Sequence, residues 1–182
     1  MKKNSGNPKG IRGRMLLRKM RECHKEIFSW GLSKVKIKPN DHILDIGCGD
    51  GFNIHNLLTE YPETIIYGLD ISPLCCKESR KLNKKFIKEN RCKIIEGDIK
   101  DTLLEEEYFD LITAFCTLRF WSDLESCAKN IFRCLKKGGV FLIADHGGYD
   151  YDEVARIFTE AGFEIVLLIR RKDKVPVFKI TK

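Results

Sequence analysis

Residues 43–52 read ILDIGCGDGF, and this segment is the most informative part of the sequence. An apolar run reaches an acid, Asp45, and is followed by Gly47, Gly49 and Gly51 and then by a segment of helical period. Glycine tolerates positive φ and lets a ligand approach the backbone closely, and the N-terminus of the next helix offers N–H groups. The pattern predicts a ligand-binding turn between a buried strand and a helix.

Strand-like and helical segments alternate through most of the chain. The predicted strands are His42–Ile46, Thr64–Leu69, Lys93–Glu96, Phe109–Phe115 and Val140–Ala144. The predicted helices are Phe52–Tyr61, Pro73–Asn90, Ser122–Lys136 and Tyr151–Ala161. Such strict alternation is typical of βαβ units, so we expect an α/β fold whose parallel sheet has helices on both faces.

The end of the chain breaks this alternation. Two strand-like runs, Phe163–Arg170 and Val175–Ile180, are separated by the link Arg171–Lys174. Because a parallel crossover needs a dozen residues or more, we expect these two strands to pair antiparallel.

The first 40 residues are basic, with 12 Lys or Arg against two acids. Residues 1–10 predict a flexible lead. A helix is predicted over Ile11–Trp30 and is expected to end at Gly31. Its predicted apolar stripe consists of Met15, Leu16, Met20, Cys23, Ile27 and Trp30. We therefore divide the chain into a basic lead with a cap helix, 1–40, and a main domain, 41–182.

Three acids lie at predicted strand ends: Asp45, Asp70 and Asp98. The carboxyl ends of parallel strands form the ligand-binding edge of an open α/β sheet, so these carboxylates should converge there. They would repel a pyrophosphate and favour a ligand with a ribose and a cationic group. We expect Asp70 to accept hydrogen bonds from a ribose diol, Asp98 to reach an adenine amino group and Asp45 to stabilise the cationic end. A nicotinamide oxidoreductase stays a distant alternative, because the spacing is GxGxG rather than GxGxxG.

Five ordered motifs carry a resemblance to a known family: LDIGCGDG, GLDIS, EGDI, FDLITAFCTLRFW and LKKGGVFLIAD. Together they resemble the class I S-adenosylmethionine-dependent methyltransferases, most closely the small bacterial UbiE-like group. The resemblance implies a Rossmann-like, seven-stranded, mostly parallel sheet of order 3-2-1-4-5-7-6 with the last strand antiparallel. It also implies cofactor-binding roles for Asp45, Gly47, Cys48, Gly49, Gly51, Asp70, Ile71, Asp98, Ile99, Ala114 and Phe115.

The sequence says less about which residues bind the methyl acceptor. His146 follows the fifth predicted strand and is the candidate general base, with Asp145 beside it as an alternative. Arg119, Trp121 and His24 are candidates for binding the acceptor. The absence of a [DN]PP[YF] motif argues against amino-group methylation of adenine, cytosine or glutamine, and the absence of a Pro-Cys pair argues against C5-pyrimidine chemistry. We expect a small-molecule acceptor. RNA or a ribonucleoprotein, bound through the basic segment, is one alternative, and a cofactor-binding regulator without turnover is another.

Composition excludes several other classes. The longest apolar runs are five residues, far below the ~20 that a membrane-spanning helix needs, and the polar start of the chain predicts no secretory signal. We therefore expect a cytoplasmic protein. Its eight cysteines include no CxxC pair and no histidine pair has ligand spacing, so we expect reduced thiols and no metal site.

Overall fold

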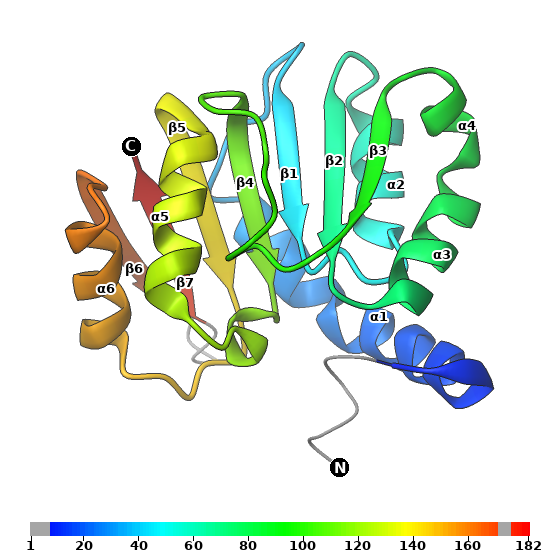
Figure 1. The fold of residues 1–182 in the computed structure, drawn as a ribbon, viewed down its shortest axis with the longest axis horizontal. Helices are drawn as coiled ribbons and strands as arrows, with labels where there is room; N and C mark the ends of the chain where they lie inside the picture. Colours follow the sequence, from blue (N-terminus) through cyan, green and yellow to red (C-terminus); the bar gives the residue numbers. More distant parts are fainter. Residues whose placement is uncertain (1–7, 171–175) are drawn as a thin grey trace.

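The computed structural model describes residues 8–170 and 176–182 as a three-layer sandwich around one sheet (Figure 1). The seven strands follow the order 3-2-1-4-5-7-6, as predicted. In sheet order they are β3 (Cys92–Glu96), β2 (Ile65–Asp70), β1 (His42–Ile46), β4 (Phe109–Phe115), β5 (Leu135–Ala144), β7 (Pro176–Thr181) and β6 (Ile165–Arg170). β7 pairs antiparallel with both β5 and β6, which confirms the expected reversal, and the predicted link Arg171–Lys174 lies outside the described residues.

Helices cover both faces of the sheet. They are α1 (Gly10–Leu32), α2 (Phe52–Glu60), α3 (Pro73–Leu82), α4 (Lys84–Lys88), the 3₁₀ turn η1 (Leu118–Phe120), α5 (Leu124–Cys134) and α6 (Tyr151–Glu160). One apolar cluster joins α5 and α6 to the sheet, and a second joins α1, α2, α3 and α4 to its other face. In Figure 1, α5 and α6 lie in front of the sheet. The central strands are therefore covered on both sides, as their nearly continuous apolar runs require.

Side-chain caps start several of these helices. Ser72 accepts a hydrogen bond from the backbone N–H of Cys75 at the start of α3, with Pro73 in the first turn. Asp123 caps α5 and Asp150 caps α6 in the same way. These caps satisfy backbone N–H groups that have no partner within the helix, which is why each helix begins directly after a strand-to-helix loop.

Two predicted boundaries are wrong. The single helix expected over Pro73–Asn90 is divided at Asn83, whose side-chain amide donates to the backbone carbonyls of Gly51 and Ser79. The fifth strand begins at Leu135 rather than Val140, because a register shift opposite the start of β4 lets the extended chain continue through Gly138.

The N-terminal helix differs most from its prediction. Gly31 does not end α1 but lies inside it, packed so closely on the sheet that a Cβ there would lie 2.6 Å from Phe115 Cε1 and 3.0 Å from Ala144 Cβ. Met15 and Cys23 are exposed, so the predicted apolar stripe is wrong at those positions. The face turned inward instead contains Gly13, Leu17, Met20, Arg21, His24, Ile27, Phe28 and Gly31.

The predicted lead also differs in part. Residues 1–7 lie outside the described residues, but Pro8 is buried and its carbonyl accepts a hydrogen bond of 3.3 Å from the Ser72 hydroxyl. In Figure 1, α1 runs along the edge of the sheet to which the parallel strands point. The division of the chain into a cap, 1–40, and a domain, 41–182, stays a prediction. In the described part of the chain, no helix combines the length and the hydrophobicity that a bilayer crossing requires.

Candidate functional site

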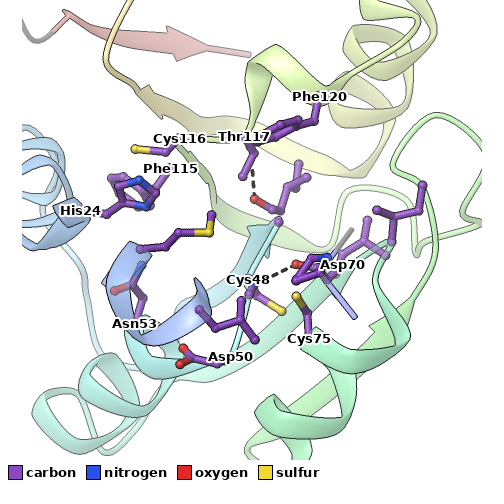
Figure 2. Close-up of a pocket in the computed structure, with 18 of the residues that line it drawn as sticks. His24, Cys48, Asp50, Asn53, Asp70, Cys75, Phe115, Cys116, Thr117 and Phe120 are labelled. Atoms are coloured by element: carbon purple, nitrogen blue, oxygen red, sulfur yellow. Dashed lines mark hydrogen bonds between the residues drawn. The ribbon is translucent and has the colours of Figure 1, made fainter. Parts of the chain in front are cut away.

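A cavity lies at the carboxyl ends of the parallel strands, beneath α1 (Figure 2). It holds about 1070 Å³, part of it open to solvent. Its wall is built from the turn after β1, the ends of β2 and β4, the loop after β3, η1 and the inner face of α1.

The three glycines of the turn all have positive φ, at 72° for Gly47, 56° for Gly49 and 76° for Gly51. A Cβ on Gly47 would overlap the side chain of Thr117, and one on Gly51 would overlap that of Ser79. A Cβ on Gly49 would meet nothing within 4 Å. Gly47 and Gly51 are therefore required by protein packing, whereas Gly49, which also lines the cavity, has open space where a Cβ would stand. Gly51 is not among the residues that line the cavity.

Asp70 closes β2 and holds the turn in place. Its Oδ2 accepts a hydrogen bond of 2.8 Å from the Gly49 backbone N–H, and its Oδ1 accepts one of 2.8 Å from the Ser72 N–H. Burial raises the pKa of this carboxyl, and the two backbone hydrogen bonds oppose the rise. Asp70 therefore orders the loop through its carboxylate and also lines the cavity (Figure 2).

Asp45 occupies a different place from the one expected. It lies inside β1, is 3% exposed and accepts a hydrogen bond of 2.8 Å from the Thr113 hydroxyl of the neighbouring strand. It does not line the cavity, because the strand continues for one more residue and the turn lies between. Burial raises the pKa of Asp45 to about 7, with a further rise from the negative charge of Asp70. The expected convergence of three carboxylates is therefore reduced to Asp70 and Asp98.

Besides the glycines, four of the residues predicted to bind the cofactor line the cavity: Cys48, Ile71, Asp98 and Ile99. The Ile71 side chain is 54% exposed although it is apolar, while Cys48 and Ile99 are buried. Asp98 Oδ1 accepts a hydrogen bond of 3.1 Å from the Lys100 N–H. This part of the wall combines apolar side chains with one carboxylate.

The end of β4 supplies another wall. Phe115 lines the cavity and its ring contacts Phe28 of α1 edge-on, with centroids 4.8 Å apart. Ala114, the other predicted contact from this strand, is fully buried and does not line the cavity. Cys116 follows with a φ of 58° and Thr117 after it, and both face the cavity.

Of the four residues predicted for the acceptor side, two line the cavity and two do not. His24 and Trp121 line the cavity, while Arg119 and His146 do not. Arg119 donates a hydrogen bond of 2.8 Å to Asp145, and the Trp121 ring stacks on Phe141 at 6.4 Å. His146 is exposed, and its ring centroid lies 5.4 Å from that of His24. Burial and the neighbouring His146 lower the pKa of His24, so its imidazole is favoured in the neutral form.

The sequence model of the family described as "Methyltransferase domain" matches residues 37–166, more than two thirds of this chain. The chain belongs to the class I S-adenosylmethionine-dependent methyltransferases.

Two bacterial relatives support this assignment, and one solved structure shows the same fold. The chain is 30% identical over 119 residues to a malonyl-[acyl-carrier protein] O-methyltransferase of Priestia megaterium, covering 65% of this chain and 42% of that protein. It is 26% identical over 110 residues to the uncharacterized methyltransferase YdaC of Bacillus subtilis, covering 60% and 59%. The structure of a SAM-dependent methyltransferase from Aquifex aeolicus matches with a TM-score of 0.76 and 16% identity, covering 90% of this chain and 95% of that one. The chain therefore spans about half the length of these two curated relatives.

Sequence analysis missed two charged residues that line the cavity. Asp50 of the glycine turn lines the cavity and forms an ion pair with Arg21 of α1, whose guanidinium also lies 4.2 Å from the centre of the Phe52 ring. Asp50 stands in the quoted motif and could have been found there. Arg21 could not, because nothing in the local sequence shows that this face of α1 is turned toward the sheet.

Proposed function

We propose that this chain binds S-adenosylmethionine in the cavity and transfers its methyl group to a small-molecule acceptor by in-line displacement. The observation that carries the proposal is the free space beside Gly49, bounded by Asp70 on one side and by Phe115 and Cys116 across the cavity (Figure 2). The left-handed turn would be strained with any side chain at Gly49, and a side chain there would narrow the approach of a ligand to the turn.

The residues present fit a ligand with a nucleoside and a cationic end. Each Asp70 oxygen accepts one backbone hydrogen bond and retains acceptor capacity, so the carboxylate can also receive the two hydroxyls of a ribose. Ile71 and Ile99 offer apolar surface to a flat base, and Asp98 beside them can accept from an amino group. Phe115 bounds the end of the cavity toward α1.

The charge of the wall supports a cationic ligand. Because Arg21 pairs with Asp50, these two lining charges compensate each other, and Asp70 and Asp98 remain as acidic groups at the wall. The cofactor supplies a methyl group on a sulfonium, whose thioether is a good leaving group. The protein then contributes mainly alignment, and well-oriented groups gain about 7 to 11 kcal/mol over reactants in free solution.

The position of α1 supports a small acceptor. Leu17, Met20 and His24 of this helix form part of the cavity wall, so the acceptor side is enclosed by the chain itself. Two basic residues of the helix are also engaged within the protein, since Arg14 pairs with Glu78 and Arg21 with Asp50. These pairings reduce the positive charge that the RNA-binding alternative requires.

Removal of a proton from the acceptor is assigned to the histidine pair. His24 lines the cavity and favours the neutral form, so it can accept a proton there, and His146 lies behind it toward solvent. His146, the predicted base, would thus act through His24 rather than on the acceptor directly. Arg119 and Trp121 stay proposed acceptor-binding residues, with Arg119 held by Asp145.

Calorimetric titration with S-adenosylhomocysteine tests the proposal. We expect saturable binding of one equivalent per chain. No binding at hundreds of micromolar would overturn it. Tight binding without methylated product across a broad screen of small acceptors would favour the regulatory alternative instead.

A further inference from the structure

Three potential metal ligands from distant segments meet beside the cavity. His24 comes from α1, Cys116 from the end of β4 and His146 from the loop after β5, and their ligand atoms all lie within 4.8 Å of one another. Figure 2 shows the His24 ring and the Cys116 side chain together on one side of the cavity. No local spacing in the sequence links these residues, which is why the sequence predicts no metal site.

The donor atoms of the three residues are available. Among residues 8–170 and 176–182, no hydrogen bond reaches the Cys116 thiol or the ring nitrogens of His24 and His146. The nearby carboxylate of Asp145 already accepts three hydrogen bonds. Their donors are the Arg119 guanidinium, the His146 backbone N–H and the Tyr149 hydroxyl. The cluster therefore holds one sulfur and two imidazoles without a partner that would occupy their lone pairs.

We propose that His24, Cys116 and His146 bind a divalent transition-metal ion of the Zn²⁺ class. One thiolate and two imidazoles form a donor set that suits borderline-soft ions and disfavours Mg²⁺ or Ca²⁺, which prefer oxygen. On binding, the Cys116 thiol releases its proton to solvent. With three protein ligands, the fourth tetrahedral position stays open to water or to another ligand.

The geometry needs little rearrangement. Zn–N distances of about 2.0 Å and a Zn–S distance of about 2.3 Å place neighbouring tetrahedral ligands roughly 3.3 to 3.6 Å apart. The present limit of 4.8 Å therefore requires a contraction of about 1 Å or somewhat more. His146 is exposed and sits directly before Gly147 and Gly148, both at positive φ, so its side chain has room to turn toward the other two.

The site adjoins the cavity of the proposed function. Two of its three ligands, His24 and Cys116, also line that cavity, so a bound ion would lie at its wall. With the ion bound, the histidine pair acts as ligands, and the ion takes over the polarisation of an acceptor group that the pair would otherwise deprotonate. The metal site itself does not depend on the proposed function, because it needs no cofactor in the cavity.

Titration with Co²⁺ tests the site, with the full chain kept reduced and freed of metal by a chelator that is then removed. We expect one Co²⁺ per chain with a sulfur-to-metal charge-transfer absorption, displaced by one equivalent of Zn²⁺. Cys116→Ser should abolish this absorption. His146→Ala, at an exposed position that leaves the fold intact, should weaken binding by more than the about 10- to 100-fold that outer-shell changes cost.

Two variants outside the cluster provide controls. Cys23→Ser changes an exposed thiol on the same helix as His24, and His55→Ala removes an imidazole from α2. Both should bind Co²⁺ as the parent protein does. Absence of binding, or an absorption that survives Cys116→Ser or is lost in Cys23→Ser, would overturn the site. Titration of the same samples with S-adenosylhomocysteine reports separately on the cofactor cavity, so the two proposals fail independently.

Discussion

At the scale of single residues, the turn after β1 shows how similar glycines serve different purposes. Gly47 and Gly51 make room for Thr117 and Ser79, whereas Gly49 borders empty space. Two aspartates on neighbouring strands also differ in their surroundings. Asp45 in β1 is enclosed between strands, whereas Asp70 at the end of β2 lines the cavity. The role of each of these glycines and aspartates therefore has to be tested by its own substitution.

Gly49→Val should remove cofactor binding, and Gly138→Val is its matched control. Both glycines have positive φ, at 56° and 75°, and a Cβ would meet nothing within 4 Å at either place. Each substitution should cost about 1–2 kcal/mol of stability through backbone strain. Only Gly49→Val should lose affinity for S-adenosylhomocysteine in calorimetry. Equal affinity for S-adenosylhomocysteine in both folded variants would show that the bound ligand does not lie against Gly49.

Asp70→Ala should weaken S-adenosylhomocysteine binding by about 1.5 to 3 kcal/mol, the scale of a hydrogen bond to a charged group. Since Asp70 also holds the Gly49 and Ser72 N–H groups, Asp70→Asn is a second variant that keeps one acceptor oxygen. Calorimetry measures both, with the exposed Asp101→Ala as control. Unchanged affinity in Asp70→Ala would place the ribose elsewhere.

Asp45→Asn should remove a pH-dependent part of the stability. Burial raises the pKa of Asp45 from 3.8 to about 7 in the folded protein, so below about pH 4 both states are protonated and the full contribution is present. As the pH rises toward 7 the unfolded chain loses this proton more readily, and stability falls by on the order of a few kcal/mol.

Urea unfolding at several pH values between 4 and 8 measures this effect. The asparagine variant keeps an oxygen that accepts a hydrogen bond from Thr113. Its free energy of unfolding should increase relative to that of the parent protein as the pH rises. The exposed Asp101→Asn should follow the parent at every pH. A constant difference between Asp45→Asn and the parent would contradict the raised pKa.

At the scale of elements, α1 is the part of the chain that turns an open sheet edge into an enclosed cavity. Its inner face combines apolar residues with Arg21 and His24, because this face packs partly on the core and partly on the cavity. Gly31 permits the close contact with β4 and β5 that fixes the helix in this position.

Gly31→Ala should therefore destabilise the protein. Alanine favours a helix over glycine by up to ~1 kcal/mol, but the added methyl group would lie 2.6 Å from Phe115 Cε1, and overpacking costs about 1–3 kcal/mol. Urea unfolding should show a net loss. Ser29→Ala, exposed on the same helix, should be neutral or stabilising. A stabilised Gly31→Ala would show that α1 does not pack tightly on the sheet.

At the scale of the whole molecule, charge is unevenly distributed but partly compensated. The first 40 residues carry a net charge of +10, yet Arg14 and Arg21 pair with acids from α3 and the glycine turn. Ion pairs thus connect the basic N-terminal segment to the rest of the chain.

We expect no measurable affinity of the full chain for a generic single-stranded RNA, even at ~50 mM salt. Fluorescence anisotropy with a labelled RNA measures this directly. Tight binding that weakens steeply as salt is added is typical of phosphate contacts, and it would favour the RNA alternative over a small-molecule acceptor.

The strands, most helices and the glycine turn could be predicted from the sequence, because hydrophobic periodicity and glycine placement act over a few neighbouring residues. The five motifs also indicated the sheet order. Tertiary structure alone decided that Asp45 is enclosed between strands, that Arg21 reaches Asp50 and that His24, Cys116 and His146 meet. These contacts join residues far apart in the chain, and they exist because parallel strands bring the loops at their carboxyl ends together next to α1 (Figure 1).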